Sequence, residues 1–456
     1  MTGSPTSPPG HGPEPRSGAA AGQPSRWTLL LALGIPAALI AAGLALVLPA
    51  LWRTAAPDLP HPRAARSASP PAPALAPAPA LPSAQPAAPA PLATQTPAAS
   101  PPPSRGPVSP APLDELARSV TPATAWLQVP AEATLTRIGF GSCLHQGMPQ
   151  PIWRAVLAAR PELFLMIGDN VYGDIRSDDA RELAAAYRAQ LAHPEFAAAR
   201  AAMPMLGVWD DHDYGQNDGG ASFTHRAAAA ALFRGFWQRP AGAGSDGGVQ
   251  LAQVFGPPGR RVQVILLDTR SFRSAFVAQS GNSRLFGKYG PDLDPTKTML
   301  GEAQWRWLAA ELEKPAEVRL LVSSIQVLSE GHAFERWGNL PLERDRLIHT
   351  IEASGANGVI LLSGDRHIGA IYNRPIAAGR ILIEITSSSL NRSYGPARDV
   401  PTAELVSDLH HAENFGWIEI DWVRRRVALA LRGIGGETLD GLVVRLSDLG
   451  LPARGD

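Results

Sequence analysis

The uneven distribution of proline is the feature that most restricts how this chain can fold. Most of the 45 prolines in the 456-residue sequence stand before about residue 130. Proline, alanine and serine dominate residues 53–122, a composition that favours extended polyproline II and removes backbone donors. We therefore interpret 53–122 as a disordered linker, and the Gly, Pro and Ser-rich residues 1–26 as a disordered tail. The folded domain is expected to cover residues 123–456.

Between the tail and the linker, residues 27–52 form an apolar run without a charged side chain. About 20 helical residues cross the hydrocarbon core of a bilayer, so this run is long enough to span it. A tryptophan stands at each end, where interfacial aromatic residues are favoured. We predict a retained, single-pass transmembrane helix in the cell (inner) membrane. The linker would hold the folded domain clear of the bilayer, on the periplasmic or extracellular side, although the flanking arginines are too balanced to fix the orientation.

Charge balance and cysteine content narrow the functional classes. The chain carries 41 basic and 41 acidic residues, so its formal net charge of zero gives no bulk attraction for nucleic acid. A single cysteine excludes an internal disulfide framework. The folded domain must therefore depend on its hydrophobic core, and the sequence shows no sign of an obligate protein partner.

Residues 123–456 alternate short β-rich runs with helical stretches, which predicts an α/β domain built in layers. The expected strands are Leu135–Gly141, Leu163–Gly168, Met205–Trp209, Val262–Asp268, Val318–Ser323, Gly358–Ser363, Ile381–Thr386, Gly416–Asp421 and Val427–Leu431. The expected helices are Ile152–Ala159, Asp179–Leu191, Ala227–Trp237, Glu302–Glu313 and Arg344–Ser354.

Four short segments carry chemically functional side chains, and each follows an expected strand. They are FGSC at 140–143, MIGDNVYGD at 166–174, VWDDHDYGQND at 208–218 and LLSGDRHIGA at 361–370. Ligands gather at the carboxyl ends of strands in layered α/β folds, so this placement is informative. Taken singly, the signals are weak, because a lone cysteine is usually a small buried hydrophobe and Gly-Asp-Asn is a common turn.

The third segment crowds four carboxylates around His212, directly after an apolar strand. A solvated acidic loop is the ordinary interpretation, but like charges this close are unfavourable unless metal, arginine or protonation offsets them. In the fourth segment, Asp365 and His367 alternate at a strand end, which would place both on one face with Arg366 opposite. Thiolate, phenolate, carboxylate and imidazole donors suit transition metals, and carboxylates also suit Ca²⁺ or Mn²⁺. A metal site is therefore the economical interpretation.

In this order, FGSC, GDNVYGD, WDDHDYG and SGDRH resemble the alkaline phosphatase D branch of the calcineurin-like metallophosphoesterases, over residues 137–386. The resemblance implies a layered β-sandwich flanked by helices. It also implies two or more metal ions, Fe(III) with Ca(II) or another divalent ion. The substrate would be a phosphate monoester or diester, attacked in line by a metal-bridging hydroxide.

The resemblance assigns a ligand set to the first metal. Members of this branch use a cysteine-containing segment where most metallophosphoesterases have Asp-x-His, which gives Cys143 a role. Cys143, Tyr172 and Asp365 would bind the iron(III)-like site. Asp169 would bridge the two metals.

The resemblance also implies the surroundings of the second metal. Asp211 stands where the broader family has the Asn of Gly-Asn-His and would bind this metal, joined by His367 and by Asn217. His212 would donate a proton to the leaving alkoxide or stabilise charge on the phosphorane.

Three further residues are candidates for substrate binding. Arg270 and Arg273 lie in LLDTRSFR, and guanidinium forks match phosphate oxygens, although structural ion pairing explains them equally well. Asn391, in SSSLNRS, is a candidate for the pocket wall, with a polar loop as the alternative. Gln326 follows a strand where the wider superfamily has a metal-binding His, and its amide is expected only to support the site.

Two alternatives remain open from the sequence. A non-catalytic, tethered binding module on the same fold would be expected to have lost its ligands, whereas every matched position holds a competent one. A Ser-type esterase needs a nucleophile in a Gly-Asp-Ser segment near the start of the domain. This chain has Gly-Ser-Cys at 141–143 in that place.

Overall fold

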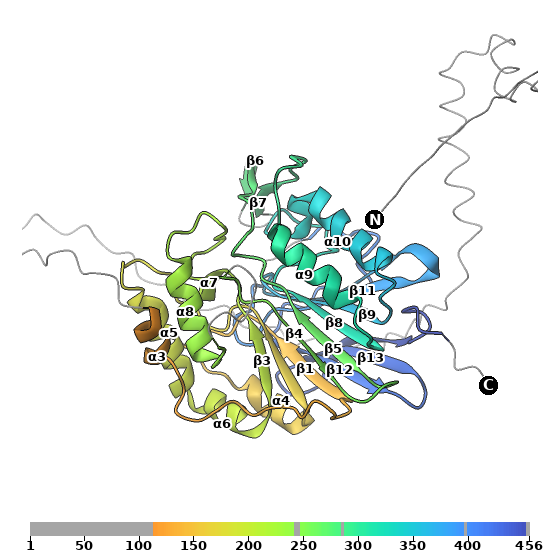
Figure 1. Cartoon of the computed structure of the whole chain (residues 1–456), viewed down its shortest axis with the longest axis horizontal. Coiled ribbons are helices and arrows are strands. Elements are labelled where there is room, and N and C mark those ends of the chain that lie inside the picture. Colours follow the sequence, from red (N-terminus) through yellow and green to blue (C-terminus); the bar gives the residue numbers. More distant parts are fainter. Residues whose placement is uncertain (1–112, 241–246, 284–286, 396–398, 453–456) are drawn as a thin grey trace, which may run out of the picture. The chain divides into compact units, whose positions relative to one another are not determined.

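The computed structural model (Figure 1) describes residues 113–240, 247–283, 287–395 and 399–452. The predicted tail, the predicted membrane segment and most of the predicted linker lie outside these residues. Within them, no helix is both long and apolar enough to cross a membrane. The end of the predicted linker does contain a helix, α3 (Leu113–Ser119), which packs against helix α8 (Arg226–Phe236). The domain thus begins earlier in the chain than the predicted residue 123.

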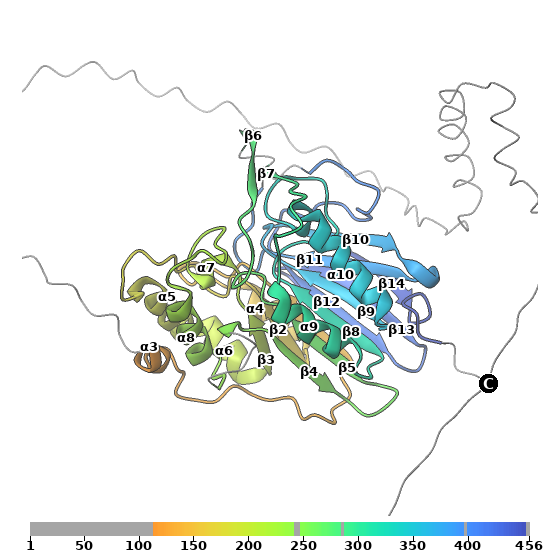
Figure 2. The same cartoon turned by 45° about the horizontal axis from the view of Figure 1, so that its top comes forward.

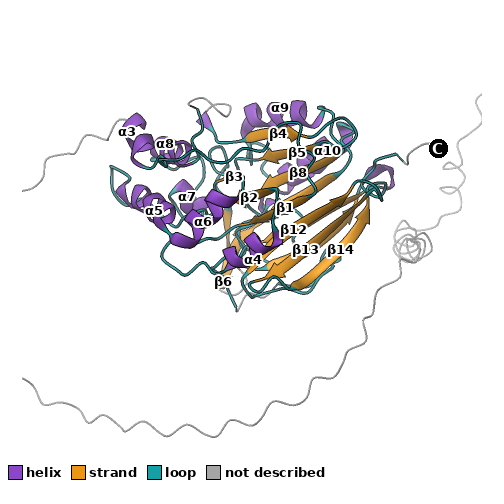
Figure 3. Ribbon diagram, turned by 90° about the horizontal axis from the view of Figure 1, so that it is seen from below, coloured by secondary structure: helices purple, strands orange, loops and turns teal. Residues whose placement is uncertain are grey.

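Two mixed sheets, each with six of the described strands, form the centre of the domain (Figure 3). The first has the order β14-β13-β12-β1-β2-β3, and the second has the order β10-β11-β9-β8-β5-β4. The strands of the first sheet are β1 (Arg137–Gly141), β2 (Leu163–Ile167), β3 (Met205–Val208), β12 (Asn414–Asp421), β13 (Arg426–Gly433) and β14 (Thr438–Arg445). The strands of the second are β4 (Leu251–Phe255), β5 (Val262–Leu266), β8 (Val318–Ser323), β9 (Val359–Ser363), β10 (Gly369–Pro375) and β11 (Ile381–Ser387). A separate hairpin pairs β6 (Val277–Ser283) with β7 (Gly287–Gly290).

Alternate residues of the second sheet enter two different cores. On β5, Val264 and Leu266 belong to the core shared with the first sheet, whereas Ile265 belongs to a core formed with helices α9 (Gly301–Leu312) and α10 (Pro341–Ala353). Successive side chains of a strand point to opposite faces, so both faces of this sheet are buried. One face packs on the first sheet, and α9 and α10 cover the other (Figure 2).

Further helices pack on the first sheet. Trp153 of α4 (Ile152–Ala159) meets the ring of Phe164 on β2 edge-on, with centroids 5.1 Å apart. The same indole lies 5.8 Å from Phe196 of α6 (Pro194–Ala202). Helices therefore flank both sheets, and the predicted α/β domain of sheets and flanking helices is confirmed.

The predicted and observed elements agree best where apolar runs are fully buried. The predicted helix Ile152–Ala159 and strand Val318–Ser323 have the observed bounds. Helix α5 (Arg181–Ala192) begins two residues later than expected. The elements that the sequence pattern did not reveal are α3, α6, α7 (Asp211–Tyr214), β4, β6, β7, β10 and β14. Several of these are short or lie at a sheet edge, where little periodicity is available.

The contact between α3 and α8 gives a stability prediction. A Cβ added at Gly235 would lie 2.1 Å from the carbonyl oxygen of Ala117, which is backbone and cannot turn away. Although alanine is the better helix former, we expect Gly235→Ala to lower the free energy of unfolding by about 1–3 kcal/mol in urea titrations. Gly395→Ala, where a Cβ meets no heavy atom within 4 Å, is the control and should change it by about 0.5 kcal/mol or less. Equal stabilities of the two variants would contradict the packing described.

Candidate metal centre

Loops after strands of both sheets bring the predicted ligands together. Cys143 follows β1, Asp169 follows β2, and His367 follows β9 of the second sheet. One ligand atom from each of these three residues lies within 4.8 Å of the other two. The sulfur of Cys143 is 3.6 Å from Oδ2 of Asp169. Residues from both sheets thus share one site.

Further groups of possible ligands overlap with this one. Asp169, Asp211 and His212 offer atoms within 4.8 Å of one another, and so do Asp210, Asp211 and Asp365. Asp169 belongs to the first two groups, and Asp211 belongs to the second and third. Shared carboxylates of this kind are suited to bridging neighbouring metal ions.

Four of the predicted ligands have a left-handed backbone. The φ angles of Cys143, Asp169, Asp365 and His367 are 61°, 46°, 64° and 59°. Such angles are uncommon outside glycine, and they cluster at functional sites because the surrounding structure must hold them. The amide of His367 donates to Oγ of Ser388 at 2.8 Å, which helps to fix its turn.

The strained turn also corrects an expectation about the fourth motif. Strand β9 ends at Ser363, so alternation along a strand does not place Asp365 and His367 on one side. Two left-handed residues in the turn achieve this instead. Arg366, expected opposite them, also lines the pocket and forms an ion pair with Asp399.

The electrostatics of the cluster fit bound cations. Burial, and then the charge of Asp211, raise the pKa of Asp169. Burial and the charges of Asp210 and Asp211 do the same for Asp365. Oδ2 of Asp210 and Oδ1 of Asp211 are buried and have no hydrogen-bond partner among the described residues. Buried carboxylates without partners are costly, and a divalent or trivalent ion removes this cost.

The thiol and phenol of the cluster fit the same interpretation. Burial, and then the charge of Asp169, raise the pKa of the Cys143 thiol. A nearby metal ion reverses that preference, because the thiolate is the form that binds metal. The hydroxyl of Tyr172 lies 3.1 Å from Nε2 of His367, within the same site. The donor set of sulfur, phenol, imidazole and carboxylate therefore suits a transition metal beside a harder cation.

His212 is held by a carboxylate that sequence reasoning did not assign. Its Nδ1 is 2.9 Å from Oδ1 of Asp174, and its backbone amide donates to Oδ1 of Asp169 at 3.3 Å. Burial lowers the pKa of His212, but the charges of Asp211 and Asp169 and the hydrogen bond to Asp174 raise it overall, to about 11. Asp174 therefore orients the imidazole, and the neighbouring carboxylates favour its protonated form.

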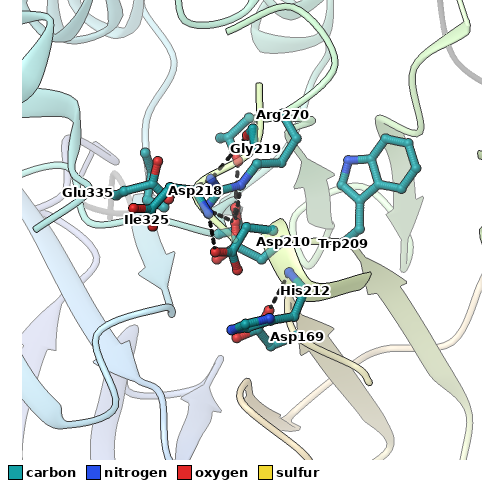
Figure 4. A network of polar contacts seen from close by, with 12 residues as sticks. Asp169, Trp209, Asp210, His212, Asp218, Gly219, Arg270, Ile325 and Glu335 are labelled. Atoms are coloured by element: carbon teal, nitrogen blue, oxygen red, sulfur yellow. Dashed lines mark hydrogen bonds and ion pairs between the residues drawn. The ribbon is translucent and has the colours of Figure 1, made fainter. Parts of the chain in front are cut away.

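Arg270 and Arg273 lie behind the metal ligands. Figure 4 shows Arg270 between Asp210 and Glu335. Its Nε donates to Oδ1 of Asp210 at 2.6 Å, and its Nη1 lies 2.5 Å from Oε2 of Glu335. Nη2 of Arg273 is 2.7 Å from Oε1 of the same glutamate. The side chains of both arginines and of their two carboxylate partners are at most 2% exposed. Neither arginine lines the pocket, so this placement does not support their predicted role in phosphate binding.

The side-chain amides of Asn391 and Gln326 are also used in hydrogen bonds within the protein. Asn391 accepts from the amide of His145 at 2.7 Å and donates to its carbonyl at 2.9 Å, so it does not face a substrate. Gln326 donates to Thr386 Oγ1 at 2.9 Å and to the hydroxyl of Tyr372 at 3.2 Å. By contrast, Asn217 lines the pocket next to the metal-binding candidates.

A pocket of about 510 Å³ opens onto the cluster. It is lined by Asp211, His212, Asn217, Asp218, Gly287, Lys288, Tyr289, Phe334, Glu335, Asp365, Arg366, His367, Arg392 and Tyr394. The sequence did not identify Lys288, Tyr289 or Arg392, because they lie outside the four motifs and come from a hairpin and a loop without periodicity. Glu335 was missed for the same reason, and it lies within 4.8 Å of Asp211 and Asp218.

The fold and the site together define an α/β domain with a candidate metal centre where two sheets meet. The model of the PhoD-like phosphatase family matches residues 139–429, which is more than half of the chain. The chain therefore belongs to the PhoD-like phosphatase family.

Individual proteins are similar to this chain over parts of their length. Alkaline phosphatase D of Bacillus subtilis (strain 168) is 26% identical over 243 residues, which cover 45% of this chain and 41% of that protein. The chain thus matches less than half of the length of this curated relative. A solved structure of PhoD has a TM-score of 0.54 and 18% identity, covers 70% of both chains, and supports the fold. Purple acid phosphatase PPD1 from yellow lupin (Lupinus luteus) seeds is 11% identical with a TM-score of 0.49, over 71% of this chain and 56% of its own.

Because the carboxylates of the cluster repel one another, Asp169→Asn is expected to affect thermal stability and metal content in opposite directions. Asp169→Asn removes a buried charge, so it should raise the thermal midpoint of the chelator-treated protein at pH 7. The same change should lower the metal content of the reconstituted protein, because a shared ligand is lost. Both are measured on one preparation, by calorimetry and by elemental analysis.

Asp178→Asn is the matched control, since the side chain of Asp178 is 92% exposed. It should change neither quantity. A variant at Asp169 that keeps its metal and gains no stability in chelator would show that this carboxylate is not part of a metal centre.

Proposed function

We propose that this domain hydrolyses phosphate esters, monoesters, diesters or both, with two or more bound metal ions. The observation that carries the proposal is the overlap of the ligand groups, which share Asp169 and Asp211, next to a 510 Å³ pocket that Asp211 lines. Membership of the PhoD-like phosphatase family supports the same activity. A pocket of this size also accommodates an organic group beside a phosphate.

The residues would divide between the metals by their chemistry. Cys143, Tyr172 and Asp365 suit Fe(III), which prefers thiolate, phenolate and carboxylate donors. Asp169 would bridge, and Asp211, Asn217 and His367 would bind Ca(II) or another divalent ion. When bound, such ions would neutralise phosphoryl oxygens and make a water nucleophilic at neutral pH.

His212 would act as the general acid. Asp174 fixes one ring nitrogen, and the surrounding carboxylates keep the imidazole protonated. The ring lines the pocket, so it can give a proton to the alkoxide that leaves phosphorus. Asp174 would orient this acid without contacting the substrate.

The alternatives have less support. A non-catalytic binding module does not require a buried cluster of partnerless carboxylate oxygens beside an oriented, protonated histidine. A Ser-type esterase would use Ser142. This residue is buried, and its hydroxyl lies 3.4 Å both from the sulfur of Cys143 and from the carbonyl oxygen of Ser387, with no histidine partner among the described residues.

Turnover tests the proposed activity directly. The metal-reconstituted protein should hydrolyse p-nitrophenyl phosphate, bis-p-nitrophenyl phosphate or both. Chelator should abolish the reaction, and added metal should restore it. Absence of turnover in a folded, metal-loaded protein would instead favour the binding module.

Replacement of His212 separates acid catalysis from metal binding. His212→Ala should lower kcat by about 10²–10⁴-fold, because proton donation is lost. The loss should be smaller for esters with a better leaving group, such as p-nitrophenolate, than for alkyl phosphates. Metal content should stay at the parental level. An equal fall in kcat for esters with good and with poor leaving groups would show that His212 is not the general acid.

We further propose that residues 27–52 anchor the protein in the cell membrane, with the domain on the periplasmic or extracellular side. The support is the uncharged apolar sequence of this segment, which lies outside the described residues. The full chain should remain with membranes after a high-salt wash, and a chain without 27–52 should not. A linker that protease cannot reach on intact cells would contradict the proposed side.

A further inference from the structure

Besides His212, the pocket is lined by Lys288, Arg366 and Arg392, and these three side chains differ in how their charge is balanced. Nζ of Lys288 lies 2.5 Å from Oδ2 of Asp218. Arg366 forms an ion pair with Asp399, and both of these side chains are at most 3% exposed. Among the residues that the structure describes, no carboxylate pairs with the guanidinium of Arg392. Arg392 therefore brings to the pocket wall a positive charge that forms no ion pair with a described residue.

This guanidinium lies close to the candidate metal ligands. Its central carbon is 4.5 Å from the ring centroid of Tyr172, a favourable distance for a cation over an aromatic face. The hydroxyl of the same tyrosine is 3.1 Å from Nε2 of His367. Tyr172 thus supports the guanidinium on one face while its hydroxyl remains in the site. Within the part of the chain that the structure describes, no side chain or carbonyl is paired with the N–H groups of Arg392.

The segment that carries Arg392 is fixed on both sides. The amide of Leu390 donates to the carbonyl of Ser142 at 3.0 Å, next to Cys143. The amide of Tyr394 donates to the carbonyl of His367 at 3.1 Å. The side chain of Asn391 bonds both backbone groups of His145. Arg392 is therefore anchored between the two loops that hold ligands, and little ordering is needed when it binds.

We propose that Arg392 binds the non-bridging oxygens of the substrate phosphoryl group and of the phosphate product. The inference rests on the proposed function and deepens it by naming the residue that recognises the anion. A guanidinium offers a planar fork of N–H donors that matches two phosphate oxygens. Arg270 and Arg273 do not fill this role, because both are paired with buried carboxylates and neither lines the pocket.

The test compares Arg392→Ala and Arg392→Lys in the metal-loaded full chain. Calorimetry measures the Kd of inorganic phosphate, and kinetics measures KM and kcat for p-nitrophenyl phosphate. For the alanine variant, we expect Kd and KM to rise about tenfold or more, because a charge-assisted fork is lost. Lysine should give an intermediate value, since it restores the charge without the fork. Metal content should match the parent.

Arg306→Ala is the control for loss of one positive charge, since Arg306 is exposed on α9, away from the pocket. It should leave the Kd of phosphate unchanged. The inference is overturned if Arg392→Ala keeps the Kd of phosphate within about twofold of the parent, or if it weakens phosphate binding only by losing metal. A parent that binds phosphate through Arg392 without hydrolysing esters would instead overturn the proposed function.

Discussion

Repulsion among buried carboxylates is the constraint on which the rest of this structure depends. Asp169, Asp210 and Asp211 are each at most 2% exposed, and their ligand atoms fall into overlapping groups. Protein groups offset part of the repulsion: Arg270 and Ser324 both bond Oδ1 of Asp210. What remains are buried oxygens of Asp210 and Asp211 that have no hydrogen-bond partner among the described residues. A protein that keeps such charges together gives up stability, and cations at this position would both restore it and supply the proposed chemistry.

The fold brings these carboxylates together because loops that follow strands of both sheets meet at one site. Each sheet contributes a strand whose following loop turns sharply: β2 leads to Asp169, and β9 leads to Asp365 and His367. The left-handed backbone at these residues is unfavourable by about 1–3 kcal/mol at each position, so packing must hold it. The two hydrophobic cores, one between the sheets and one under α9 and α10, supply that packing. The strained backbone and the buried carboxylates therefore occur together in these loops, and Arg392 lines the adjacent pocket.

Many strands and the loops that carry the metal-binding candidates could be predicted from the sequence. The surroundings of several polar side chains could not, for physical reasons. Strands such as Val318–Ser323 are buried on both faces, so local composition reveals them. The four motifs also indicated the loops that gather at the site. The ion pair of Arg270 could not be predicted, because its partner Glu335 is 65 positions away and lies in no recognisable motif. The hydrogen bonds of Asn391 could not be predicted either, since its partner His145 lies 246 positions earlier in the chain. Whether a polar residue faces a ligand or a loop is decided by long-range packing, which local patterns do not record.

We propose above all that the carboxylate cluster holds metal ions and that Asp169 is shared between them. The most direct measurement is a crystal structure of the metal-loaded protein with anomalous scattering recorded at the iron edge and above it. We predict at least two metal peaks, one next to the sulfur of Cys143 and one next to Asp211, with Asp169 between them. A well-ordered cluster without anomalous peaks, or with metal only at exposed carboxylates, would contradict the account.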